Sequence, residues 1–179
     1  MRRLIFPILL IGASMIQMSF MSATSLTRTS VHLLLVVGTY VMLGHSYERA
    51  LLWVVGGGLL LDTESVAPYG TETVSMAIAV MVGYIVYRRY FTNKSVATLI
   101  VLSLVASVTY ILVGTAVRMT ASALDPAAVP VPFGPQELVR WASFLLANTV
   151  AAVLLSFVVS RWYRPLALQR SLLSGVRRP

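Results

Sequence analysis

The chain contains no cysteine, which excludes disulfide bonds, thiolate nucleophiles and cysteine metal sites. It is also poor in charge: 11% of its 179 residues are charged and 58% are hydrophobic, a balance outside the range of soluble globular domains. Among the charged residues the acidic ones are fewer, with six Asp and Glu against fourteen Lys and Arg. Because the basic residues stand at the ends of apolar runs, they suit lipid head groups and topology control, and we expect no nucleic-acid partner.

Long runs without a charged residue make up most of the chain. Three of them, 4–27, 95–117 and 141–160, contain 20 to 24 residues each. Since a helix rises 1.5 Å per residue, each run can cross about 30 Å of hydrocarbon. We therefore expect an all-α integral membrane protein that forms a single domain over 1–179, with a basic cytoplasmic tail over 161–179. Shorter runs complete six predicted spans, at about 4–22, 29–46, 48–61, 73–88, 95–117 and 138–160.

The distribution of lysine and arginine predicts the orientation. An even number of spans puts both termini on one side, and eleven of the fourteen basic residues fall on that side. The positive-inside rule makes it the cytoplasmic side, so we expect cytoplasmic N- and C-termini. Arg28, Arg118 and Arg140 are then expected on the outer side. The loop 62–72 and the proline-rich loop 119–137 should also lie outside.

Half of the acidic residues lie in one segment, GGGLLLDTESVAPYGTE, at residues 56–72. The uncharged run before Asp62 covers only about 18 Å as a helix, so Asp62 should lie below the outer surface. An aspartate near mid-bilayer costs about 2.5–3.5 kcal/mol, a cost tolerated mainly where protein or water surrounds it. We expect a polar, partly re-entrant hairpin in which Pro68 and Gly70 make the turn. An exposed loop with solvated acids, or a simple capping role for Asp62, remains the alternative.

The same segment resembles the signature of the MreD family of rod shape-determining proteins. The resemblance rests on Gly-Leu-Leu-Leu-Asp at 58–62, Pro-Tyr-Gly at 68–70 and an apolar helix containing Gly-Tyr at 83–84. It is dense over about 55–90 and covers the rest of the chain through length, helix count and basic cytoplasmic ends. The chain departs from the family at Thr-Glu-Ser, 63–65, where apolar and small residues are usual. Its outer loop before the last helix is also longer and richer in proline than is expected for the family.

The resemblance implies a non-enzymatic scaffold, without a cofactor, in the bacterial inner membrane. Such a protein would belong to the cell-elongation machinery that synthesises peptidoglycan. It would bind the transmembrane segment and adjacent extracellular part of MreC, and it would work with MreB, RodA and a class B penicillin-binding protein. The positions carried over are Asp62, Pro68 and Gly70, with Gly58 as a weaker match. The resemblance gives Asp62 hydrogen bonds to backbone, Tyr or Arg groups that fix the hairpin, whereas Pro68 and Gly70 set its turn.

Small residues recur every four positions on two of the predicted spans. This spacing lets helix backbones approach closely in lipid, either within the bundle or against a partner's helix. We expect the basic tail to contact anionic lipids. The small-residue stripes are Ser75, Ala79 and Gly83 on the fourth span, and Ser143, Ala147 and Ala151 on the sixth.

The polar and aromatic residues near span ends suggest structural roles. Tryptophans such as Trp53 are expected to be interfacial anchors. His32 and His45 fall at opposite ends of one predicted span, so they cannot share a metal and should be interfacial. The outward Arg118 and Arg140 are candidates for ion pairs with four acidic residues: Asp62, Glu64, Asp125 and Glu137.

Two other function classes remain as alternatives. The S-components of energy-coupling-factor vitamin transporters are six-helix proteins of similar length and fold, and Trp53, Tyr69 and Trp141 could stack on a vitamin in an outer pocket. Against this, the first predicted span lacks their Ala-x-x-x-Ala docking pattern. An intramembrane enzyme finds still less support, because the chain has no His-Glu-x-x-His, Gly-x-Gly-Asp or Gly-x-Ser-Gly motif.

Overall fold

Helices are the only regular elements among the residues that the computed structural model describes, so the all-α prediction is confirmed for that part of the chain. The described residues are 10–17, 19, 31–44, 46–63, 65, 70–92, 95–124 and 134–175, without the side chains of 159, 160 and 162–175. Residues 10–17 form a helical segment that precedes five labelled helices. These are α2 (Leu33–Gly44), α3 (Tyr47–Asp62), α4 (Thr71–Tyr90), α5 (Val96–Leu124) and α6 (Pro135–Gly175).

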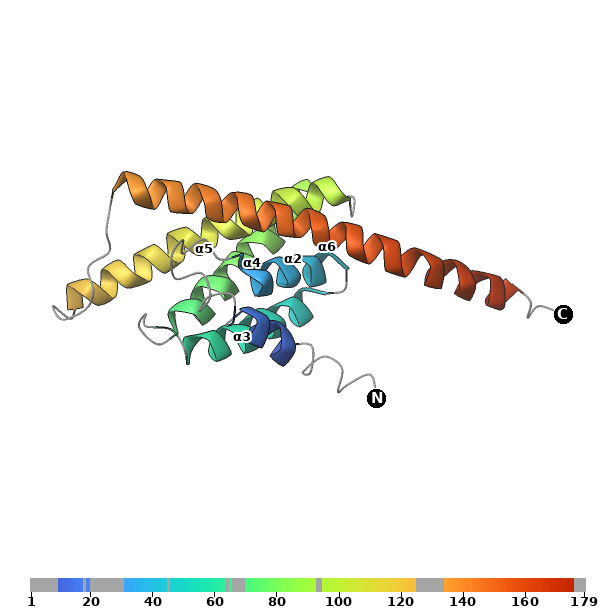
Figure 1. Ribbon diagram of the computed structural model, residues 1–179, viewed down its shortest axis with the longest axis horizontal. Coiled ribbons are helices and arrows are strands. Elements are labelled where there is room, and N and C mark those ends of the chain that lie inside the picture. Colours follow the sequence, from blue (N-terminus) through green and yellow to red (C-terminus); the bar gives the residue numbers. More distant parts are fainter. Residues whose placement is uncertain are drawn as a thin grey trace.

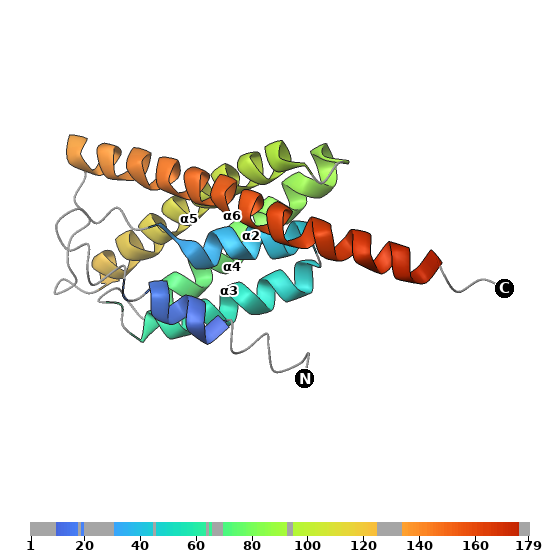
Figure 2. The same cartoon turned by 45° about the vertical axis from the view of Figure 1, so that its right-hand side comes forward.

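The short helix α2 lies in the middle of the bundle. It contacts α3, α4, α5 and α6, and both ribbon views place it among them (Figures 1 and 2). Its sequence, LLLVVGTYVMLG, has no charged residue and no polar face, so enclosure on all sides costs it little. The helices α3, α4, α5 and α6 follow one another as antiparallel neighbours. Their packing fixes which residues meet at each end of the bundle.

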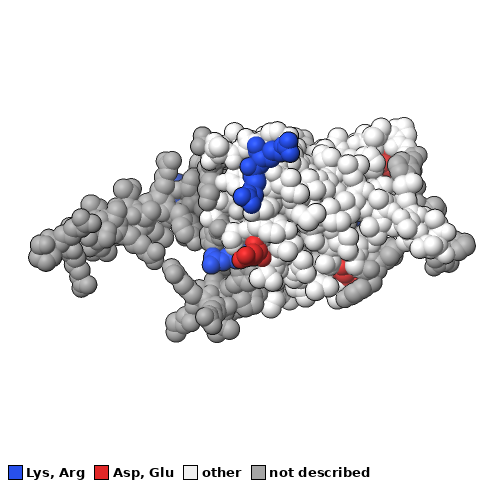
Figure 3. Space-filling model, turned by 180° about the vertical axis from the view of Figure 1, so that it is seen from behind, with Lys and Arg blue, Asp and Glu red and all other residues white. Residues whose placement is uncertain are grey.

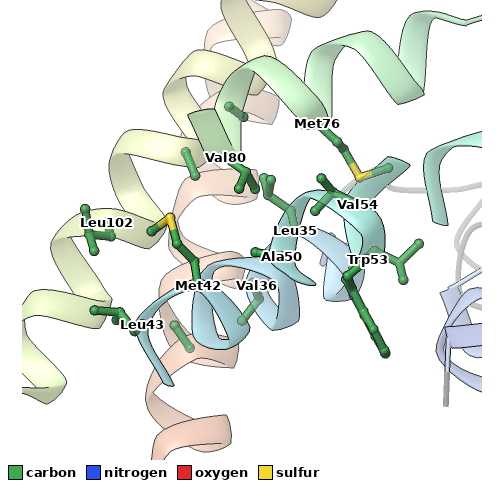
Figure 4. Close-up of a cluster of buried hydrophobic side chains, with 14 of the residues drawn as sticks. Leu35, Val36, Met42, Leu43, Ala50, Trp53, Val54, Met76, Val80 and Leu102 are labelled. Atoms are coloured by element: carbon green, nitrogen blue, oxygen red, sulfur yellow. The ribbon is translucent and has the colours of Figure 1, made fainter. Parts of the chain in front are cut away.

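An apolar core fills the space between these helices. Leu35, Met76 and Leu102 are fully buried, and they come from α2, α4 and α5 (Figure 4). Trp53 also belongs to this core and is only 5% exposed. The expectation that Trp53 is an interfacial anchor or a stacking residue of an outer pocket is therefore wrong. Its ring is large and apolar, and α3 turns that face toward the centre of the bundle rather than outward.

The tip of the α3–α4 hairpin depends on a glycine. A Cβ atom built on Gly58 would lie 2.6 Å from Thr73 Cα and 3.0 Å from Thr73 N, both backbone atoms of α4. Only a residue without a side chain therefore allows α3 to approach α4 this closely. Glycine at position 58 thus sets the distance between the two helices beside the acidic segment.

The two longest helices extend beyond the spans expected from the sequence. α5 continues to Leu124 and α6 runs without interruption to Gly175, so the expected tail begins as a continuation of the last helix. Two helices of the described residues are long and apolar enough to cross a membrane: α5, and Pro135–Val158 of α6. α2 is a shorter apolar helix. Of the first expected span, only residues 10–17 and 19 are described, and the six-span topology remains a prediction.

The outer surface of the bundle is strongly apolar. Large hydrophobic side chains such as Leu112, Leu146 and Phe157 are 61–67% exposed. Most of the face drawn in Figure 3 carries no charged side chain, and the Lys and Arg atoms visible there lie toward one end of the molecule. A surface of this kind is unfavourable in water and suits a hydrocarbon environment.

Candidate functional site

Asp62 is the last residue of α3, and its side chain caps the N-terminus of the next helix. The backbone N–H of Glu72 donates to Asp62 Oδ1 at 2.9 Å, and that of Thr73 donates to Oδ2 at 3.1 Å. The Thr73 hydroxyl donates to Oδ2 at 2.6 Å. Gly70, at the N-cap position, has a left-handed φ of 90° and no side chain that could cap. The acid at 62 therefore supplies, from across the hairpin, the acceptor that α4 lacks.

Glu72, in the first turn of α4, carries its carboxylate into the bundle and is 3% exposed. The Tyr110 hydroxyl of α5 donates to Glu72 Oε2 at 2.5 Å. His32 Nε2 lies 3.5 Å from the same oxygen, and Arg118 Nη2 lies 3.7 Å from Oε1. A carboxylate in an apolar bundle needs such partners, since an unpaired buried charge is costly. Glu72 thus joins α4 to α5 and to the start of α2.

His32 precedes α2 directly and is 2% exposed. Its backbone N–H donates to Asn148 Oδ1 of α6 at 2.7 Å, and Asn148 Nδ2 donates to the Ser107 hydroxyl of α5 at 3.0 Å. The next backbone N–H, of Leu33, donates to Gln17 Oε1 at 2.8 Å. Side chains from two distant helical segments therefore cap α2, as Asp62 caps α4. The expectation that His32 is interfacial is wrong, because these caps draw it into the bundle, whereas His45 lies outside the described residues.

The ring of His32 lies against aromatic side chains. Its centroid is 4.7 Å from that of Tyr110 and 6.3 Å from that of Phe144, and the Tyr110 and Phe144 rings stack at 5.6 Å. Together, Asp62, Glu72, His32, Tyr110, Arg118 and Asn148 form what we call the polar cluster. It occupies the place where the N-termini of α2 and α4 meet the middle of α5 and α6.

The position of the polar cluster along the two long helices is the same on each. Tyr110 precedes Arg118 by eight residues on α5, and Asn148 follows Arg140 by eight residues on α6. Eight residues of helix span about 12 Å. Tyr110 and Asn148 therefore lie about 12 Å along their helices from Arg118 and Arg140, respectively.

The residues expected at the hairpin come together as one unit. Gly58 touches α4 and Asp62 caps it, while Gly70 takes the left-handed conformation that begins it. Pro68 and Glu64 lie outside the described residues. The alternative of an exposed loop with solvated acids is wrong for Asp62 and Glu72, both of which are 3% exposed.

The two expected small-residue stripes differ in their surroundings. On α4, Ser75 and Ala79 are buried, and a Cβ atom built on Gly114 of α5 would lie 3.3 Å from Ser75 Oγ, so this stripe packs within the bundle. Gly83, the third member, is also buried. On α6, Ser143, Ala147 and Ala151 are half-buried. They line a shallow apolar groove together with Val31, Leu146, Val150 and Leu154.

Several members of the polar cluster were not identified from the sequence. Tyr110 and Asn148 stand inside long uncharged runs, where single polar residues are common, and nothing local marks them. Arg140 pairs with Glu137, which was one of the acidic residues expected as its partner. Arg118 lies near Glu72, which was not among the expected partners. The one available signal for Glu72 was its place in the first turn after the Pro-Tyr-Gly motif.

The polar cluster has limited chemical capacity. Both carboxylate oxygens of Asp62 already accept hydrogen bonds from α4. Among the residues that the structure describes, no group of three or more His, Asp or Glu side chains could hold a metal ion. Comparisons of the chain with protein-family models, curated proteins and solved structures gave no match.

Proposed function

We propose that the chain is a non-enzymatic scaffold of the cell-elongation machinery in the bacterial inner membrane, similar to MreD proteins. In this role it binds MreC and supports RodA with its class B penicillin-binding protein, and MreB acts on the cytoplasmic side. The observation that carries the proposal is the capping of α4 by Asp62. It ties the residues of the family-like motif to one another in space.

The motif residues hold the backbone rather than present reactive groups. Gly58 allows the close approach of two helices, Asp62 satisfies the orphan N–H groups of α4, and Gly70 supplies a backbone conformation that other residues rarely adopt. A motif whose members specify a shape is what a scaffold requires. An enzyme whose active site contained these motif residues would instead need an acid, a base or a nucleophile that is free to react.

A membrane location is supported by the two long apolar helices and by the exposed hydrophobic side chains around them. The six-span topology is predicted from the apolar runs, and the cytoplasmic termini are predicted from the distribution of basic residues. Within this arrangement, the stripe of Ser143, Ala147 and Ala151 is the better candidate for contact with a helix of MreC, because the stripe on α4 is already buried.

Co-purification with MreC from native membranes tests the proposal. The wild-type protein should recover MreC, and Asp62→Ala should recover less because the uncapped hairpin no longer holds its shape. Thr63→Ala, at the exposed neighbouring position, serves as the control and should behave as wild type. Failure of the wild-type protein to recover MreC would reject the proposed partner. Equal recovery by Asp62→Ala would reject the role of the cap alone.

A further inference from the structure

We propose that Arg88 and Arg89, in the last turn of α4, bind the phosphate head group of an anionic phospholipid. The proposal rests on the membrane location argued above, and it does not depend on MreC or on any other protein partner. The site is distinct from the basic tail 161–179, because it lies on one face of α4.

One face of α4 combines an apolar strip with the two cationic groups. Val74, Met81 and Ile85 are 44–54% exposed, and their spacing of seven and four residues puts them on one side of the helix. Arg88 and Arg89 follow Ile85 by three and four residues, so they continue the same face. The fourteen residues from Val74 to Arg88 cover about 21 Å of helix, more than one leaflet of about 15 Å requires. An acyl chain along the apolar strip therefore places its phosphate beside the arginines.

The end of the α3–α4 hairpin that carries these arginines has an excess of positive charge. Arg49, in the first turn of α3, lies at the same end, because Tyr47 of α3 stacks on Tyr84 of α4. Glu48 is the one acidic residue that the described part of the chain places there. All three arginines are exposed, and none forms an ion pair with a described residue. Their charge is therefore free to attract an anionic head group.

Aromatic rings hold one of the two guanidinium groups in place. The Arg88 guanidinium lies 5.8 Å from the centroid of the Tyr84 ring, which is itself stacked on Tyr47 at 4.4 Å. Attraction between the cation and the ring restrains the planar group and leaves the N–H donors at its edge accessible. Those donors match pairs of phosphate oxygens, and the neighbouring Arg89 adds a second positive charge. The arrangement is therefore suited to a phosphate group at the membrane surface.

The first test is native mass spectrometry of the full-length protein in a neutral detergent. Phosphatidylglycerol and phosphatidylcholine with identical acyl chains are added together, and we expect the wild-type protein to retain phosphatidylglycerol preferentially. Because each basic residue near an anionic head group accounts for roughly a fivefold factor, the double variant Arg88→Gln/Arg89→Gln should bind it about tenfold more weakly or less. Arg161→Gln removes an exposed arginine at the start of the basic tail and should bind as the wild type does. Equal binding by the double variant, or an equal loss in Arg161→Gln, would overturn the proposal.

The second test separates lipid binding from a purely structural role of the arginines. Positive groups in the last turn also suit the helix dipole, but that role does not depend on the lipid. In nanodiscs of phosphatidylcholine alone, the wild-type protein and the double variant should unfold at similar temperatures. Added phosphatidylglycerol should raise the wild-type midpoint by about 2–4 °C and leave the double variant unchanged.

The same rise in both proteins, or a rise produced equally by inorganic phosphate, would overturn the proposal. MreC is absent from both experiments. A negative result here would therefore leave the proposed partner untouched, and failure to recover MreC would leave the lipid site untouched.

Discussion

At the scale of single residues, Asp62 shows how an acidic group can be accommodated in an apolar bundle. Its carboxylate is buried, yet three donors from the first turn of α4 surround it. Its negative charge also lies at the positive end of the helix dipole, which stabilises it further. The cost of burial is thereby offset by bonds that the helix needs in any case, since its first N–H groups have no partner within the helix.

Removal of this carboxylate should destabilise the protein in a graded way. Asp62→Ala leaves buried N–H groups without an acceptor, and we expect it to lower the free energy of unfolding by about 2 kcal/mol. Asp62→Asn keeps one acceptor oxygen and should lose roughly half as much. Denaturant unfolding in detergent measures both, with the exposed Thr63→Ala as a control within about 0.5 kcal/mol of wild type. Equal stability of Asp62→Ala and wild type would contradict the capping role.

At the scale of elements, the α3–α4 hairpin is held by contact at both ends. At the tip, Gly58 of α3 lies against Thr73 of α4. At the other end, Tyr47 stacks on Tyr84 with ring centroids 4.4 Å apart, and Arg88 lies 5.8 Å above the Tyr84 ring. The two helices are therefore antiparallel over almost the whole length of α3. Their shared tip delivers Glu72 to the polar cluster.

Because the tip is packed backbone against backbone, it should not tolerate a methyl group. Gly58→Ala would force α3 away from α4, since a backbone atom cannot turn aside as a side chain can, and we expect a loss of about 1–3 kcal/mol. Gly12→Ala is the matched control. A Cβ atom there meets nothing within 4 Å, so the change should be neutral or slightly stabilising through helix propensity. Thermal unfolding distinguishes the two, and similar midpoints would argue against the close approach.

At the scale of the whole molecule, the polar cluster has a defined depth if α5 and α6 cross the membrane. Tyr110 and Asn148 lie about 12 Å along their helices from Arg118 and Arg140, which in the predicted orientation is within the outer half of a hydrocarbon layer about 30 Å thick. Ionisable groups at such depth are costly and are usually tied to function. Helices that begin inside the bundle, as α2 and α4 do, are acceptable there because protein side chains cap them.

The orientation can be tested with single cysteines, because the chain has none of its own. Tyr90, at the end of α4, is 71% exposed, and Leu124, at the end of α5, is 82% exposed. The predicted topology places Leu124→Cys outside and Tyr90→Cys in the cytoplasm. A membrane-impermeant thiol reagent added to spheroplasts should therefore modify the first variant alone, and detergent should expose the second. Modification of Tyr90→Cys in intact spheroplasts would contradict the predicted orientation.

The sequence by itself determined the helical class, the long apolar runs and the position of the hairpin. These properties depend on local composition. A long uncharged apolar run predicts a membrane-spanning helix, and the proline and glycine at 68 and 70 predict the turn of the hairpin. It also singled out Asp62, because an acid between apolar helices is unusual.

Only the tertiary structure decided what the polar residues do. Tyr110 lies 38 residues from its partner Glu72 in the sequence, and Asn148 lies 116 residues from its partner His32. No local pattern encodes such pairings, because they arise where antiparallel helices bring their faces together. The same packing buried Trp53 and one small-residue stripe and left the other stripe half-exposed. Composition determines that helices form, whereas their packing determines which side chains meet.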